Sequence, residues 1–368
     1  MIKKLCLLLI VSSSLLYSQQ NELHFYSVET SYFYGSILEH NLDISHLITD
    51  FPTGVIVSLN KKTYGYNEWE GRFNFPDWGV TMIYQDMKNP FLGKNMSIYG
   101  HFNFYFLKRH LSLGVGQGIA YASKIYDPET NFNNNAYGSR ILSSTLVRVN
   151  LVKENLFKGL GVHIGTGIIH YSNANLKAPN GSTNTWYFDA GISYQLKHDR
   201  FPLRIPKETF PSKFYEEDIK LNLVFRTGIN EADVNGLGQD PFYVFSFYAD
   251  KRLNFMSTVQ FGFDLFYSTF LKKVIEYRSI AFPEDFLTGD EDYKRIGLFL
   301  GHELRFNKNA FVSQVGYYIY WPYKFETRIY NRLGIKRYLF KDKFFAAITL
   351  KAHFAKAEAV EFGAGIRF

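Results

Sequence analysis

Cysteine is nearly absent from this sequence of 368 residues, and the one present is Cys6. It lies in an N-terminal segment where Lys3 and Lys4 precede an apolar run and then small residues. This is the pattern of a secretory signal peptide, which we expect to occupy residues 1–18. Its removal leaves a mature chain, residues 19–368, without a thiol. An exported chain without cysteine cannot use disulfides, so other interactions must hold its fold together.

Long apolar runs are absent after the N-terminal segment. A membrane-spanning helix needs about 18 or more consecutive apolar residues, and no stretch after Tyr17 approaches that length. Charge is not concentrated either, because 41 Lys and Arg against 34 Asp and Glu give a net charge of +7 without a basic run. We therefore expect no helical membrane span and no nucleic-acid partner. No group of Cys, His or carboxylates has metal-ligand spacing, so we expect no metal and no cofactor.

Aromatic residues and glycine are abundant instead. Phe, Tyr and Trp make up 18% of the sequence, with 36 Phe, 27 Tyr and 4 Trp, and there are 28 glycines. From residue 23 to the C-terminus, large apolar side chains alternate with small or polar ones, as they do in strands with two different faces. An exported, aromatic-rich chain of such strands is typical of a transmembrane β-barrel.

Three segments show the alternation most clearly: LSLGVGQGIAYAS at 111–123, VQFGFDL at 259–265 and AVEFGAGIRF at 359–368. In each, one face suits lipid and the other suits a crowded or wet interior. The last segment ends on Phe368. A terminal strand that ends on an aromatic residue resembles the recognition signal of outer-membrane barrels, so we expect the barrel-assembly machinery as a partner.

The connections between the expected strands alternate between short and long, as do periplasmic turns and outer loops. Threading the chain through them predicts an all-β fold: a single antiparallel barrel of about 14 strands, with 12 or 16 as alternatives, over residues 19–368. Two connections fit poorly. The long polar segment 198–216 falls on the periplasmic side, and a tight connection near Lys356 falls outside. No linker or composition shift divides the mature chain.

A histidine and a serine stand out in VHIGTGIIHYSN, residues 162–173. Because side chains alternate along a strand, His170 and Ser172 share the lipid-facing side of Ile168, near the outer end of the strand. Positions i and i+2 lie about 6–7 Å apart at Cα, within reach of an imidazole and a hydroxyl. A serine becomes nucleophilic when an adjacent base takes its proton. The pair therefore predicts attack by Ser172, with His170 as base, on an ester held in the bilayer.

The following strand, NTWYFDAGISYQL at 184–196, supplies a third member. Asn184 has the parity of the apolar face and is expected opposite His170, where it could accept the second imidazole N–H and fix the tautomer. Asp189 has the other parity and is expected to face the lumen.

These residues resemble the outer-membrane lipid A deacylases of the PagL type, also called lipid A 3-O-deacylases or acyloxyacyl hydrolases. The resemblance covers residues 95–197 and includes, more loosely, GQGIAYASKIYD at 116–127. Its motif consists of His170, Tyr171, Ser172, Asn173, Ala174, Pro179 and Asn180. It implies that His170 is the base, Ser172 the nucleophile and Asn180 a stabiliser of the oxyanion. Where the family has a glutamate fourteen residues after the histidine, this chain has Asn184.

The resemblance also implies a substrate and a place of action: an ester-linked acyl chain of lipid A, the membrane part of lipopolysaccharide, in the bacterial outer membrane. The alternative is a non-enzymatic barrel that acts as a pore or transporter. The strands after residue 197 favour it, because a wider barrel can enclose a channel. His170 could also be an interfacial histidine without a catalytic role. His302 has a lipid-facing parity but no serine two residues away, so we interpret it as structural.

Overall fold

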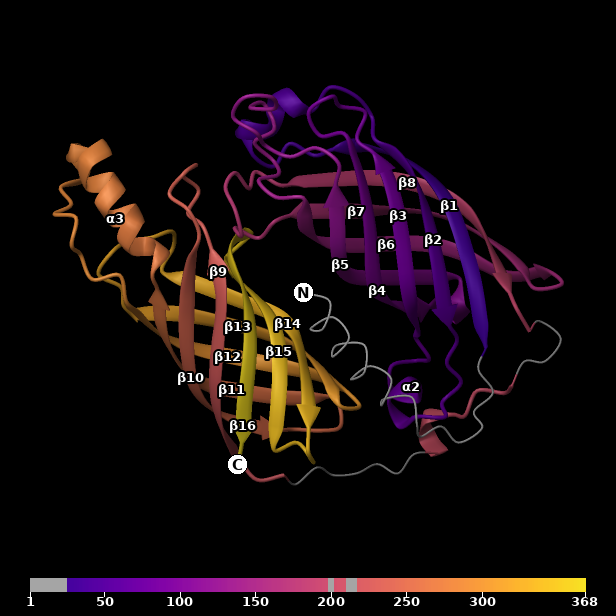
Figure 1. The fold of residues 1–368 in the computed structure, drawn as a ribbon. Helices are drawn as coiled ribbons and strands as arrows, with labels where there is room; N and C mark the ends of the chain where they lie inside the picture. The colour runs from indigo at the N-terminus through magenta and orange to yellow at the C-terminus, as the bar shows by residue number, and fades with distance from the viewer. Residues whose placement is uncertain (1–24, 198–201, 210–216) are drawn as a thin grey trace, which may run out of the picture.

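The computed structural model describes residues 25–197, 202–209 and 217–368, and the expected signal peptide lies outside the described residues. Two closed antiparallel barrels of eight strands each lie side by side (Figure 1). The strands of the first barrel are β1 (Tyr26–Ile37), β2 (Thr53–Lys61), β3 (Asp77–Asp86), β4 (Lys94–Phe106), β5 (Leu111–Ala122), β6 (Ile141–Phe157), β7 (Leu160–Ser172) and β8 (Thr183–Gln195). The strands of the second barrel are β9 (Lys220–Asn230), β10 (Asp240–Arg252), β11 (Ser257–Ser268), β12 (Arg295–Phe306), β13 (Asn309–Tyr320), β14 (Ile329–Leu339), β15 (Phe344–His353) and β16 (Lys356–Arg367).

The prediction of a single barrel is wrong, although sixteen strands fall within the predicted range. Strand β8 turns back onto β1, with Ser27 opposite Gln195 and Ile37 opposite Thr185, so the first barrel closes on itself. Strand β16 closes the second barrel on β9 in the same way. The segment 198–216, which broke the expected turn pattern, belongs to the connection between β8 and β9. Periodicity could not show this, because it gives the faces of a strand but not its partners.

Within the described residues, the connections contain six short helical elements: η2 (Leu42–Leu47), α2 (Glu68–Arg72), η3 (Leu107–Arg109), η4 (Lys207–Thr209), α3 (Phe270–Ala281) and η5 (Pro283–Asp285). None of the helices in the described part of the chain is both long and apolar enough to span a membrane. Helix α3 follows β11 and packs Leu271 and Ile275 against Tyr323 of the β13–β14 loop. The connections at one end of both barrels are long, apart from β15–β16, and those at the other end, apart from β2–β3 and the β8–β9 linker, are tight turns (Figure 1).

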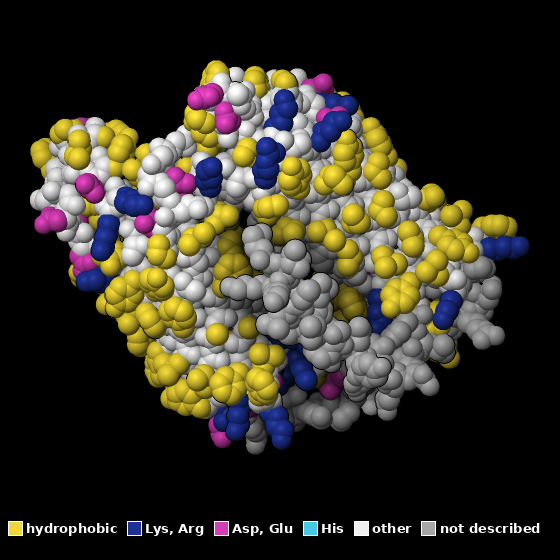
Figure 2. Space-filling view, viewed as in Figure 1, with side chains coloured by type: hydrophobic (Ala, Val, Ile, Leu, Met, Phe, Trp, Pro, Cys, Tyr) yellow, Lys and Arg dark blue, Asp and Glu magenta, His cyan; other side chains and the backbone are white. Residues whose placement is uncertain are grey.

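The two faces of each strand differ as the alternation predicted. In β5, Val115 and Ile119 are exposed on the outside, whereas Ser112 and Ala120 are buried inside. The outer walls therefore consist of apolar side chains, and Figure 2 shows them covering the sides of both barrels, with charged side chains mainly toward the loops and turns. Apolar residues outside and polar residues inside are the reverse of a water-soluble protein and typical of a barrel in lipid.

Side chains fill the described interior of both barrels. The first barrel has an apolar cluster at its outer end, capped by Ile44 and Leu47 of η2 and by Tyr137. In the second barrel, the Arg332 guanidinium is fully buried and contacts Asp264 at 2.9 Å and Glu361 at 2.5 Å. An eight-stranded barrel is just wide enough for its own side chains, so this packing is what its size dictates.

Candidate functional site

Strands β7 and β8 place the predicted site residues on the outer wall of the first barrel. His170 is half-buried and Ser172 is 5% exposed, although both have the outward parity of exposed Ile168. The β7–β8 loop, residues 173–182, follows Ser172 directly and accounts for its burial. The site therefore lies where the apolar wall ends and the outer loops begin.

His170 and Asn184 are direct neighbours across the β7–β8 pair. The distance between His170 Nδ1 and Asn184 Oδ1 is 2.7 Å. An amide oxygen can only accept, so Nδ1 carries the proton and donates it to Asn184. The other ring nitrogen, Nε2, is then the basic one.

The Ser172 hydroxyl has two partners in the β7–β8 loop. It donates to Asn180 Oδ1 at 3.0 Å and accepts from the backbone N–H of Ala174 at 2.9 Å. Within the described residues, the hydroxyl therefore bonds to the loop rather than to His170. Catalytic hydrogen bonds are often long or poorly aligned without substrate, so the absence of this bond does not by itself exclude the pair.

Asn180 lies beside Ser172, but it presents its oxygen rather than its NH₂ group. Its Oδ1 also accepts from the backbone N–H of Asn173 at 2.9 Å, and its Nδ2 donates to Asn175 Oδ1 at 2.8 Å. The amide thus ties the loop together around Ser172. The donor that already points at the serine oxygen is the N–H of Ala174.

Two polar residues that lie level with His170 on the adjacent strands were not predicted from the sequence. Gln117 on β5 pairs with Thr145 on β6, which pairs with His170. Thr145 Oγ1 donates to Gln117 Oε1 at 2.7 Å, and Gln117 Nε2 donates to Ser143 Oγ at 3.0 Å. We call Gln117, Thr145, His170 and Asn184 the polar row. Parity alone would have placed Gln117 outside, but cross-strand register was needed to bring it level with His170.

Other predicted positions fall elsewhere. Asp189 is buried inside the barrel, 3.3 Å from His163, as its parity indicated. His302 lies on the outer wall of the second barrel, where its Nε2 is 2.5 Å from Ser257 Oγ of the neighbouring strand. This histidine–serine contact could not be found from i, i+2 spacing, because the serine comes from another strand.

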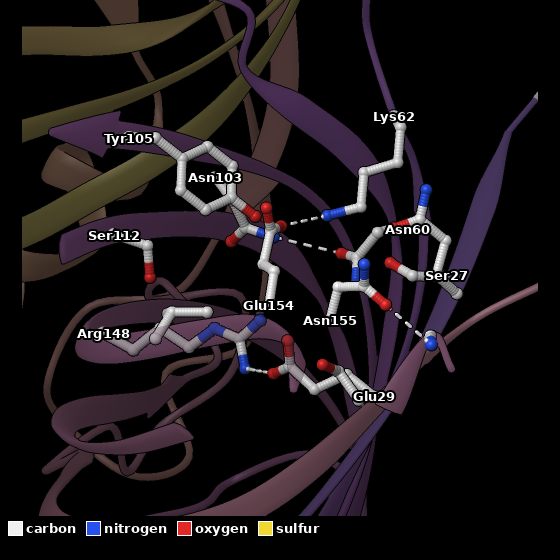
Figure 3. A pocket seen from close by; sticks show the side chains of 14 residues that line it. Ser27, Glu29, Asn60, Lys62, Asn103, Tyr105, Ser112, Arg148, Glu154 and Asn155 are labelled. Carbon is white, nitrogen blue, oxygen red and sulfur yellow. Dashed lines mark hydrogen bonds and ion pairs between the residues drawn. The ribbon is translucent and has the colours of Figure 1, made fainter. Parts of the chain in front are cut away.

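A small cavity inside the first barrel lies at its inner end (Figure 3). Its volume is about 20 Å³, which is room for a water molecule or two. The lining is dominated by ion pairs: Lys62 lies 2.5 Å from Glu154, and Arg148 lies 2.6 Å from Glu29. Burial alone would lower the pKa of Lys62, but the carboxylates of Asp77 and Glu154 outweigh it and raise that pKa. The cavity is lined by paired charges and is too small for an acyl chain.

Metal-ligating residues do not gather in the described chain: among residues 25–197, 202–209 and 217–368, no group of three or more His, Cys, Asp or Glu could hold a metal ion. The polar row must therefore be considered as an arrangement of a hydroxyl, an imidazole and amides.

Two family models match the chain. The model for lipid A 3-O-deacylase (PagL) matches residues 53–196, and the model for the C-terminal domain of acyloxyacyl hydrolase matches residues 219–368. The first match covers most of the first barrel, and the second match the second barrel. The family likeness thus extends on both sides of the range 95–197 that the motif alone indicated.

A search of curated proteins found no match. Similar solved structures include an engineered protein described by its asymmetric conductivity, with 7% identity and a TM-score of 0.21. A triple mutant of the Rhodopseudomonas blastica porin has 8% identity and a TM-score of 0.20. Each alignment covers 94% of this chain and 100% of the other. At such TM-scores, the likeness supports no conclusion about fold or function.

Proposed function

Since the chain belongs to the PagL-type lipid A 3-O-deacylase family, we propose that it is an outer-membrane serine esterase that hydrolyses an ester-linked acyl chain of lipid A. Ser172 is the nucleophile, His170 the base and Asn184 the group that orients the imidazole. The hydrogen bond between His170 Nδ1 and Asn184 Oδ1 is the observation that carries this proposal.

That bond selects the tautomer that the reaction needs. With the proton held on Nδ1, the lone pair of Nε2 is free to take the proton of Ser172 as its oxygen attacks the ester carbonyl. The same nitrogen then returns the proton to the leaving alkoxide of the sugar. An acyl-enzyme remains, and water activated by His170 releases the fatty acid.

The oxyanion requires a donor close to Ser172. The N–H of Ala174 is 2.9 Å from the serine oxygen. When Ser172 Oγ moves toward His170, this N–H becomes free to donate to the carbonyl oxygen of the ester. Asn180 supports this role by fixing the backbone of Asn173 through its side-chain oxygen. We propose that Asn180 contributes mainly through this contact.

The direction of the site indicates where its substrate resides. His170 lies on the apolar outer wall, on the side of exposed Ile168 and Trp186 rather than of the lumen, and Ser172 lies next to it beneath the β7–β8 loop. An ester at the boundary between acyl chains and headgroup can reach this position from the bilayer, whereas a soluble ester gains nothing from it. Gln117 and Thr145 would then meet polar groups of the same lipid.

A pore is not favoured by the described interior. Side chains fill both barrels, and the outer mouth of the first is capped by Ile44, Leu47 and Tyr137. The pore was favoured because a single wide barrel can enclose a channel. Each barrel has only eight strands, so this reason no longer applies.

The test uses the full chain purified in detergent and incubated with lipid A, with mass spectrometry to detect loss of one acyl chain. Wild type is expected to release a fatty acid and Ser172→Ala to release none. Ser257→Ala is the matched control, because Ser257 contacts His302 on the outer wall of the second barrel and is expected to be dispensable. Equal activity in wild type and Ser172→Ala would exclude the mechanism, and loss of activity in Ser257→Ala alone would move the site to the second barrel.

A further inference from the structure

The β7–β8 loop of the first barrel is held by the second barrel. Among the described residues, four hydrogen bonds join this loop to the second barrel. The Glu231 N–H donates to the Asn175 carbonyl at 2.8 Å, and the Ala178 N–H donates to Glu231 Oε2 at 3.1 Å. Gln239 Nε2 donates to the Leu176 carbonyl at 2.7 Å, and Asn175 Nδ2 donates to the Ala357 carbonyl at 2.8 Å. The contacted groups come from the β9–β10 loop and the start of β16, so two separate parts of the second barrel engage one loop.

Asn175 connects this contact to the proposed nucleophile. Its Nδ2 bonds to Ala357 of the second barrel, while its Oδ1 accepts from Asn180 Nδ2 at 2.8 Å. Asn180 in turn accepts from the hydroxyl of Ser172 at 3.0 Å. One uninterrupted series of side-chain hydrogen bonds therefore runs from the second barrel to Ser172. Each amide in it has one orientation that satisfies both neighbours, so the series fixes the position of Asn180.

Glu231 is an unusual residue to find in this contact. It is 6% exposed, and its partners in the described chain are backbone N–H groups, of Ala178 on one oxygen and of Gly238 on the other, rather than cations. A buried carboxylate without a cation costs free energy unless hydrogen bonds satisfy it. Gly238 belongs to the same loop as Glu231, whereas Ala178 belongs to the β7–β8 loop, so both carboxylate oxygens are satisfied only when the two barrels are in contact.

We propose that the second barrel is a scaffold for catalysis and that Asn175 and Glu231 are positioning residues, which hold the β7–β8 loop so that Ser172, Asn180 and the Ala174 N–H keep their places. This inference rests on the proposed function. The scaffold role gives the second barrel a function that does not require an open channel through its interior. It also implies that the esterase site is complete only when both barrels are present.

Two nearly isosteric substitutions in the full chain test the proposal. Asn175→Asp keeps the oxygen that Asn180 needs and tolerates the positive φ of 59° at this position, but it loses the donor to Ala357. Glu231→Gln keeps one acceptor and replaces the other with an NH₂ group that faces a backbone N–H. Asp233→Asn is the control, because Asp233 lies in the same loop and pairs with Lys356 but makes none of these four bonds.

Two measurements are made on each variant. The first is the rate of tryptic cleavage after Lys177, an exposed residue in the β7–β8 loop. The second is kcat and KM on lipid A. Asn175→Asp and Glu231→Gln are expected to speed cleavage and to lower kcat by about 10- to 100-fold with little change in KM, since misplacement of a catalytic group by about 1 Å has effects of this size. Asp233→Asn should match wild type in both.

The outcomes separate the two proposals. Unchanged cleavage at Lys177, or faster cleavage with unchanged kcat, would overturn the scaffold role while leaving the esterase intact. Full activity of Ser172→Ala would overturn the esterase, and with it any catalytic meaning of the contact, even if the loop were shown to be held. A lower folded fraction in a variant would be detected by its mobility on unheated gels, and kcat would be corrected for it.

Discussion

Ser172 is a hydroxyl beside an apolar wall, and its surroundings satisfy it on both sides: the oxygen accepts from Ala174 and the hydrogen is donated to Asn180. His170 is satisfied at Nδ1 by Asn184. Polar groups beside an apolar surface are costly when unpaired, so these contacts explain how the two side chains are accommodated there. They also leave Nε2 as the one ring nitrogen available for chemistry.

The role of Asn184 can be tested by replacement in both directions. Asn184→Leu removes the acceptor for Nδ1, so the tautomer is no longer selected, and we expect kcat on lipid A to fall at least about 100-fold. Asn184→Glu keeps an acceptor and adds the charge typical of the family, so it should match or exceed wild type. Equal rates for wild type and Asn184→Leu in the mass-spectrometric assay would contradict the role.

Gln117 is expected to bind substrate rather than to support the fold. It is exposed on the outer wall, and Gln117→Leu should lower kcat/KM by about 3- to 10-fold, the value of one neutral hydrogen bond, without loss of folding. Val115→Leu, two positions earlier on the same face, is the control. An unchanged kcat/KM in Gln117→Leu would show that Gln117 does not bind the substrate.

Strands β4 and β5 show how closely the wall of the first barrel is packed. A Cβ on Gly118 would lie 1.9 Å from the backbone oxygen of Ile98, which cannot move without disturbing the strand pair. A Cβ on Gly100, also in β4, would meet nothing within 4 Å. The two glycines are therefore present for different reasons, and only the first is required by packing.

The variants Gly118→Ala and Gly100→Ala make the same substitution at a crowded and at an open position. Gly118→Ala should destabilise the barrel by about 1–3 kcal/mol, as overpacking does, whereas Gly100→Ala should stay within about 0.5 kcal/mol of wild type. Urea unfolding from lipid vesicles, followed by tryptophan fluorescence, would measure both. Equal losses of stability in Gly118→Ala and Gly100→Ala would show that packing does not require Gly118.

Every strand pair among the sixteen described strands lies within one barrel or the other. Each barrel also has its own buried interior, with the apolar cluster and ion pairs of the first separate from the Arg332 network of the second. The two should therefore stay folded independently when the chain between them is cut, although they remain in contact through the β7–β8 loop and through the rings of Phe102 and Phe306.

A protease site inserted after Leu203, which is 93% exposed, tests this independence. After cleavage in detergent, both fragments are expected to keep the shifted mobility of folded barrels on unheated gels and to resist further digestion. The same insertion variant without protease treatment serves as control. Rapid digestion of either fragment would mean that its barrel depends on the other for stability.

The sequence by itself determined the faces of the strands and the outward direction of the site. Alternation placed His170, Ser172 and Asn184 on the lipid side and Asp189 in the lumen, because side-chain direction depends only on position along a strand. The motif around Ser172 was sufficient to indicate the family.

Only the tertiary structure decided how the strands close, and with that the number of barrels. The pairing of β8 with β1 is a contact between residues about 150 positions apart, and no local pattern encodes it. The same holds for the site: the alignment of Gln117 with His170, the orientation of Asn180 and the contact between Asn175 and Ala357 all depend on register and loop packing. Long-range hydrogen bonds fixed these features, so they became visible only in the folded chain.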